Sequence, residues 1–136
     1  MIKGRAWGPI SRKGSKPKIT DTLKATVEAR SNELVESVLK PRSIQPPPED
    51  DRFNYIVDIY TKWHGSGFYF LSKYRCPGPN AIVPFFETGF ARMEYAGQNR
   101  FNLSMMRHTG QWQRIFFDFT LDECLTSIRD DPFFGP

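Results

Sequence analysis

Apolar side chains recur at every second position through the middle of the chain, and this period constrains the fold more than any other feature. Successive side chains of a strand point to opposite faces, so a period of two predicts strands with one buried face. The alternation begins in residues 52–62, where one face of the strand would carry Phe53, Tyr55, Val57 and Ile59.

Short glycine-containing segments separate the alternating stretches and predict hairpin turns. These turns are "HGSG" at 64–67, "AGQN" at 96–99 and "HTGQ" at 108–111. The segment "CPGPNAIVP", residues 76–84, is expected to be a loop, because proline cannot donate to a central strand. An antiparallel meander follows. Its five strands are expected at 52–62, 68–75, 87–95, 100–107 and 112–119.

A first helix is expected before the sheet. Thr20 or Asp21 can cap its first turn by accepting from backbone amides. Proline disfavours a helical residue before it, so Pro41 is expected to end the helix. The apolar stripe of this helix contains Leu23, Val27, Leu34 and Val38, with Val35 and Leu39 beside it.

A second helix is expected after the sheet. Thr120 and Glu123 have the spacing of a capping box, in which each side chain bonds the other residue's backbone amide. The tail after this helix is too apolar to be free, and Phe133 and Phe134 are expected to fold back onto the core. The apolar stripe of this helix contains Leu121, Cys124, Leu125 and Ile128.

The sequence therefore predicts an α+β fold: a five-stranded antiparallel meander with an N-terminal and a C-terminal helix packed on one face. Alternation in the last three strands assigns side chains to the two faces. The covered face is expected to carry Ala91, Met93, Tyr95, Phe101, Leu103, Met105, Ile115 and Phe117. The open face is expected to carry Arg92, Glu94, Arg100, Asn102, Ser104, Arg114 and Asp118, with Trp112 and Phe116 among them.

Positive charge is concentrated at the N-terminus. The first twenty residues hold six basic side chains and no acid, whereas the remainder of the chain is slightly acidic. We therefore expect residues 1–19 to form a mobile basic arm and residues 20–136 to form one α+β domain. The overall hydrophobic content of 39% is that of a globular protein.

Several cellular settings are disfavoured by composition. Two cysteines are too few for a disulfide scaffold, and no apolar run reaches the roughly 20 residues of a membrane span. The basic N-terminus lacks the apolar stretch of a secretory signal. By elimination, a cytoplasmic protein is expected, a monomer or weak homo-oligomer with no membrane partner.

The order of these segments is similar to that of a known family. "FARMEYAGQNRFNLSMMRHTGQWQRIFFDFTLDECLTSIRDDPFFG" resembles the end of a family of small bacterial domains of unknown function, and "DRFNYIVDIY" and the upstream helix fit in order. The resemblance covers about residues 20 to 135. The basic arm and the proline-rich loop depart from it. It implies membership of a family and no activity.

The sequence carries no recognisable catalytic or metal-binding pattern. The chain has no nucleophile elbow, no phosphate-cradling loop and no dinucleotide fingerprint, and its histidines and cysteines lack metal-ligand spacing. We expect no cofactor and no metal, and the balance is against an enzyme. One enzymatic alternative stays open: a hydrolase-like site near the proline-rich loop, built from His64 with Asp58 or Cys76.

A binding or interaction module is the preferred interpretation, with an acidic protein surface or nucleic acid as partner. The nucleic-acid alternative rests on basic side chains beside aromatic ones, which hold phosphates and stack on bases. Ion pairs of the arginines with Glu94 and Asp118 on a solvated sheet would explain the same residues without a ligand. The candidate binding residues are Lys13, Lys16, Lys18, Arg92, Arg100, Arg114 and Trp112.

Overall fold

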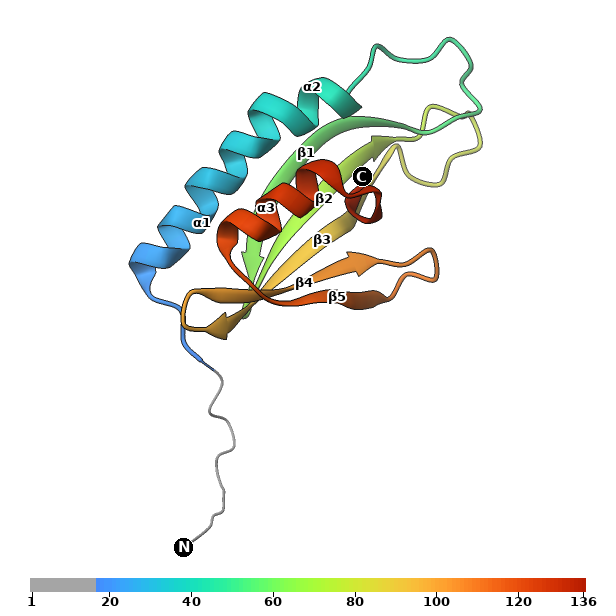
Figure 1. Cartoon of the computed structure of the whole chain (residues 1–136). Helices are drawn as coiled ribbons and strands as arrows, with labels where there is room; N and C mark the ends of the chain where they lie inside the picture. The colour runs from blue at the N-terminus through green and yellow to red at the C-terminus, as the bar shows by residue number, and fades with distance from the viewer. Residues whose placement is uncertain (1–16) are drawn as a thin grey trace, which may run out of the picture.

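A computed structural model describes residues 17–136, and Figure 1 shows their arrangement as two helical segments on one face of a curved sheet. The chain runs helix, two strands, loop, three strands, helix, in the predicted order. The elements are α1 (Asp21–Leu34), a π-helical turn (Val35–Leu39), α2 (Lys40–Ser43), β1 (Tyr55–His64), β2 (Gly67–Arg75), β3 (Phe85–Gly97), β4 (Arg100–Met106), β5 (Trp112–Phe119), α3 (Leu121–Asp130) and a 3-10 turn (Pro132–Phe134).

The five strands form one sheet in the order β1-β2-β3-β4-β5, and each neighbouring pair is antiparallel. The predicted meander and the α+β class are thereby confirmed. Every hairpin joins strands that are adjacent in sequence, so the sheet is assembled from local connections. Within residues 17–136, every helix is too short or too polar to cross a lipid bilayer.

The first helix begins as predicted and ends later than predicted. Thr20 caps it, and its hydroxyl accepts from the Leu23 amide at 3.1 Å. Pro41 does not end the helix, which continues through α2 to Ser43. The reason lies in the preceding π-helical turn, where the Lys40 amide donates to the Val35 carbonyl five residues back. The wider turn leaves room for a proline ring that would otherwise collide with a carbonyl.

Both helical segments pack on the same face of the sheet and bury one core between the two layers (Figure 1). The helix at the N-terminal end contributes apolar side chains one or two turns apart, and the strands contribute alternate residues. The fully buried core residues include Val27, Val35, Leu39, Ile59, Phe68, Phe70, Met93, Phe101, Leu103, Cys124, Ile128 and Phe134.

β-Bulges overturn two of the predicted face assignments. In β5 the register shifts between the pairs Leu103–Phe116 and Ser104–Arg114, so the extra residue reverses the alternation that follows. Phe116 therefore packs on the helix side and stacks on Phe119 with ring centroids 4.6 Å apart. Phe117, predicted to be covered, is 59% exposed.

A similar correction applies to the start of β1. The register shifts between Ile56 and Asp58, so Val57 is an extra residue and breaks the predicted alternation. Phe53 lies before the strand and is 60% exposed rather than buried. Ile59 keeps its predicted place in the core.

The last helix starts as the capping box predicted. The Thr120 hydroxyl accepts from the Glu123 amide at 3.1 Å, and the Glu123 carboxylate accepts from the Thr120 amide at 2.8 Å. Asp131 then caps the final turn by accepting from the Phe133 amide at 3.0 Å. The chain folds back as expected, but only Phe134 enters the core; Phe133 is 54% exposed.

The contrast between these two phenylalanines is testable. Phe134→Ala is expected to lower the free energy of unfolding by about 3–5 kcal/mol, because it leaves a cavity beneath the C-terminal turn. Phe133→Ala removes the same atoms from the neighbouring exposed position and should change stability by less than about 1 kcal/mol. Chemical denaturation of both variants measures the difference, and equal losses would contradict the described packing of the tail.

Candidate binding face of the sheet

The face of the sheet away from the helices, called here the open face, carries a continuous row of polar and aromatic side chains. The strand register aligns one residue from each of the five strands, since each pairs directly with the next. The neighbours of the central three residues include Phe68, Phe70, Ala91, Met93 and Leu103, which are buried in the core, so the row lies on the opposite side of the sheet. The row contains Lys62, Tyr69, Arg92, Ser104 and Arg114.

Trp112 lies beside this row and reaches across the sheet. It starts on the edge strand β5 opposite Met106, and its indole extends over Gly89 in β3. A Cβ added at Gly89 would lie only 2.8 Å from the indole Cζ2 atom, so the absent side chain makes room for the ring. Tyr69 meets the same indole edge-on, with ring centroids 5.7 Å apart. A glycine in a strand interior here marks a close approach of a ring to the backbone.

These aromatic side chains wall a shallow hollow of about 300 Å³. Its floor includes Leu71, which is only 9% exposed although it lies on the side of the sheet opposite the main core. A second, small apolar cluster therefore forms on the open face, and Lys62 and His64 border it. The hollow is lined by Lys62, His64, Tyr69, Leu71, Gly89, Met106 and Trp112.

Two arginines meet at one carboxylate next to the indole. The Glu94 Oε1 atom lies 3.4 Å from the Arg92 guanidinium and accepts from the Arg114 Nε at 3.2 Å. The Arg92 guanidinium also lies over the Trp112 ring, 5.0 Å from its centroid. A single carboxylate between two guanidinium groups leaves one positive charge uncompensated, and the partial burial of Arg92 and Glu94 reduces its screening.

Charge is divided between the two faces of the domain. The helices α1 to α3 carry more acid than base: Asp21, Glu28, Glu33, Glu36, Asp122, Glu123 and Asp130 against Lys24, Arg30, Lys40, Arg42 and Arg129. The open face carries more base than acid: Lys62, Lys73, Arg75, Arg92 and Arg114 against Glu87 and Glu94. Asp58, at the β1 edge, pairs with Lys40 of α2 at 3.3 Å. The sheet surface is thus the positive side of a slightly acidic domain.

Hydrogen bonding further occupies the acidic side chains of this face. Glu87 accepts from the Tyr60 hydroxyl, and burial together with this bond raises the pKa of Tyr60 to about 12. Lys62, by contrast, forms no ion pair with another residue of the described segment 17–136. Among the described residues, Lys62 is therefore a basic group beside the hollow that is free to meet an anion.

The fold brings together only some of the binding residues that the sequence predicted. Arg92, Arg114 and Trp112 cluster on the open face, but Arg100 lies apart, at the start of β4. Its guanidinium donates to the Asp118 carbonyl at 3.2 Å and lies 4.0 Å from the Glu123 carboxylate. Lys18 is exposed, whereas Lys13 and Lys16 fall outside the described residues.

Sequence reasoning missed Lys62, His64, Tyr69 and Gly89 as members of the same surface. Their register would have revealed it: Lys62 and Tyr69 pair directly, and Tyr69 pairs with Arg92. The isolated glycine in the third strand was a further signal of a close contact.

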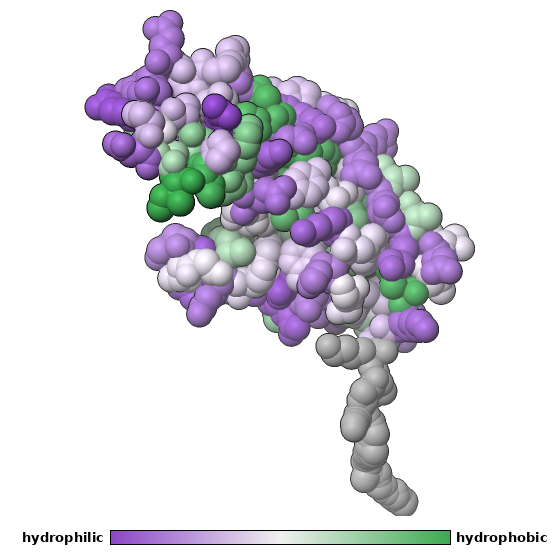
Figure 2. Space-filling model, turned by 180° about the vertical axis from the view of Figure 1, so that it is seen from behind, coloured by the Kyte–Doolittle hydropathy of each residue, from purple (hydrophilic) through white to green (hydrophobic). Residues whose placement is uncertain are grey.

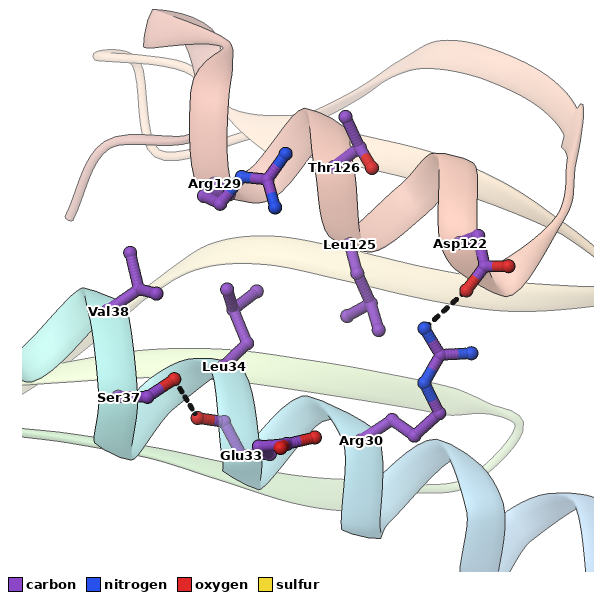
Figure 3. A pocket seen from close by; sticks show the side chains of 9 residues that line it. All are labelled: Arg30, Glu33, Leu34, Ser37, Val38, Asp122, Leu125, Thr126 and Arg129. Atoms are coloured by element: carbon purple, nitrogen blue, oxygen red, sulfur yellow. Dashed lines mark hydrogen bonds and ion pairs between the residues drawn. The ribbon is translucent and has the colours of Figure 1, made fainter.

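A second hollow, between α1 and α3, is better explained by packing (Figure 3). It measures about 310 Å³, and Figure 3 shows Leu34 and Leu125 pointing toward each other across it. Its cations are engaged: Arg30 pairs with Asp122, and Arg129 pairs with Asp130 at 2.9 Å. This groove is the seam between two helices rather than a charged site.

The proposed hydrolase-like residues do not converge. Asp58 and His64 are separated by six residues of the same extended strand, or roughly 20 Å at about 3.3 Å per residue. Cys76 follows the end of β2, beside the opposite end of β1 from His64. Among residues 17–136, no three His, Cys, Asp or Glu side chains lie close enough together to hold a metal ion.

The chain belongs to the DUF3024 family, a domain of unknown function, whose family model matches residues 19–135. The match covers the whole described fold and therefore confirms the resemblance seen in the sequence. Searches among curated proteins and among solved structures gave no match.

Because the Trp112 indole packs on Gly89, substitutions at these two positions are expected to have coupled effects on stability. Gly89→Ala places a methyl group against the indole and is expected to lower the free energy of unfolding by about 1–3 kcal/mol. In a Trp112→Ala background the same change should be neutral or stabilising, because the collision is gone and alanine suits a strand better than glycine. Gly135→Ala, where a Cβ meets nothing closer than 3.7 Å, is the control. Additive effects in the double-mutant cycle would contradict the stack.

The two cysteines should differ in reactivity. Cys124 is fully buried in the core, and burial raises the pKa of its thiol from the usual 9 to about 12, whereas Cys76 is partly exposed. A thiol-specific reagent is expected to label only Cys76 in the folded protein and both cysteines in denaturant. Because folding favours the protonated Cys124, its contribution to stability is present below pH 9 and is lost as the pH rises toward 12. Rapid native labelling that persists in a Cys76→Ser variant would be inconsistent with this core.

Proposed function

We propose that this domain is a binding module and that its open face holds single-stranded nucleic acid. The observation that carries the proposal is the hollow beside Trp112: aromatic walls, a glycine under the indole and unpaired positive charge at the border. Proteins that hold single strands combine a positive surface along the backbone with aromatic platforms for the bases. A volume near 300 Å³ suits one planar ring rather than a large cofactor.

The distribution of charge supports this ligand over an acidic protein surface. Both would be attracted to the basic open face, but a nucleic acid presents phosphates and flat bases together, which fits basic residues beside Tyr69 and Trp112. The acidic helical layer on the other side of the domain would repel phosphates and so favour one binding orientation.

The N-terminal segment enters the domain beside this face. Pro17 lines a small hollow together with Glu94, Asn102 and Arg114, and it lies close to Gly97 at the end of β3. The sixteen residues that precede it include five basic side chains and no acid. Lys13, Lys16 and Lys18 are therefore proposed as phosphate contacts in addition to those of the open face. Each such contact releases counterions and makes the binding affinity depend more steeply on salt concentration.

Anisotropy of a labelled single-stranded oligonucleotide tests the proposal at low and at physiological salt. Lys62→Glu is expected to weaken binding about tenfold and to reduce the salt slope by about one, since it removes a phosphate contact beside the hollow. Trp112→Ala should weaken binding by about 1–3 kcal/mol through lost stacking.

Arg42→Glu is the control, because it makes the same charge change on α2, on the helical side of the sheet. The Arg42 guanidinium also donates to the Arg129 carbonyl at 2.6 Å, so the fold of this variant is checked by circular dichroism first. It should leave affinity within about twofold at physiological salt, where long-range electrostatics are screened. Equal weakening by both reversals, or no binding of the full chain at low salt, would refute nucleic-acid binding by this face.

A further inference from the structure

One end of the domain exposes large apolar side chains that neither the core nor the open-face hollow uses. The loop between β2 and β3 carries Ile82, which is fully exposed, and Val83, which is 50% exposed. Phe53, in the neighbouring loop before β1, is 60% exposed, and Phe85 and Phe86 at the start of β3 are 41% and 38% exposed. These five residues are called here the apolar end, and hydrophobic colour gathers at this end of the molecule in Figure 2.

The apolar end is held in a defined shape by backbone contacts. The Cys76 amide donates to the Pro84 carbonyl at 2.8 Å and closes the loop, and the Ala81 amide donates to the Gly78 carbonyl at 3.1 Å within it. Phe86 stacks on Tyr74, with centroids 5.0 Å apart and nearly parallel rings. The loop also lies against its neighbour, because a Cβ at Gly78 would be 3.5 Å from the Asp51 carbonyl. A surface fixed in this way loses little entropy on association.

Opposite charges flank the apolar end on two different elements. On the strand side, the Lys73 ammonium and the Arg75 guanidinium lie 4.8 Å and 5.0 Å from the centroid of the Phe85 ring. On the loop side, the three acidic residues 49–51 are followed by Arg52 and then by Phe53. The Arg52 guanidinium pairs with the Asp50 carboxylate at 2.6 Å. The surface therefore has an apolar centre with a basic border and an acidic border.

We propose that the apolar end binds a second copy of this chain and forms a two-fold symmetric dimer. In such an interface the same patch is used twice, so the acidic border of one copy faces the basic border of the other. An apolar centre with polar, complementary borders is the usual composition of a protein interface. An anionic membrane or a nucleic acid would be repelled by the acidic residues 49–51, which is why a second copy fits better. This proposal does not rest on ligand binding, although its basic border, Lys73 and Arg75, belongs to the open face.

Sedimentation equilibrium of the full chain over a range of concentrations, up to the order of 1 mM, tests the proposal, since a specific weak dimer forms within that range. Ile82→Asp is expected to raise the dimer dissociation constant by at least about tenfold, because it sets a charge in the apolar centre. Phe117→Asp is the matched control: it places the same charge at another exposed apolar residue, on β5 away from the loops, and should leave dimerisation unchanged.

A charge-exchange pair tests the two-fold arrangement itself. One variant reverses the acidic border (Glu49→Lys with Asp51→Lys), and the other reverses the basic border (Lys73→Glu with Arg75→Glu). Each variant alone is expected to be monomeric at concentrations where the native chain is a dimer, because like charges then face each other twice. Mixing the two should restore a heterodimer in which both border contacts are attractive again.

Three results would overturn the proposal. The first is a native chain that stays monomeric throughout the concentration range. The second is a dimer that persists in Ile82→Asp. The third is a failure of the two mixed charge variants to associate. Co-sedimentation of the native chain with vesicles that contain anionic lipid tests membrane binding as the alternative. Binding of the monomer to these vesicles that is lost in Ile82→Asp would assign the apolar end to a membrane surface instead of a second copy.

Discussion

Val27 and Leu39 from the first helix and Cys124 and Ile128 from the last all pack against the same face of the sheet. Because both helices use one face, a meander of five strands is left with its other face toward solvent. That face cannot be as apolar as the core. It is built instead from charged residues and from aromatic rings such as Trp112, whose indole extends over Gly89 and contacts Tyr69 edge-on. The polar and aromatic open face, which we propose as a binding surface, is thus a consequence of one-sided packing.

The same arrangement separates charge across the domain. The helices face solvent with mostly acidic side chains, whereas the open face gathers basic ones around a few paired acids. The formal charge of the sequence conceals this division, because the basic N-terminal residues dominate the total. In the folded domain, Pro17 lines the same small hollow as Arg114 of the open face.

Local signals in the sequence predicted the hairpins and the Thr120 cap correctly, because turns and caps depend on a few adjacent residues. Pro41 led to a wrong prediction of the helix end, because the π-helical turn before it has room for the proline ring, which would clash in an ordinary α-helix. Phe117 was assigned to the wrong face because one extra residue in β5 reverses the alternation, and periodicity cannot locate a bulge. The contact of Trp112 with Gly89 joins β5 to β3 and depends on register across three strands, which no local pattern specifies.

Chemical-shift mapping by NMR with a short single-stranded oligonucleotide tests the central claim most directly, because it reports on every backbone amide and on the indole of Trp112 in one titration. The account predicts that the largest changes fall on the central row, from Lys62 through Tyr69 and Arg92, and on the Trp112 indole, while the amides of α1 and α3 stay fixed. Changes confined to the helical layer, or none at all at low salt, would contradict the account.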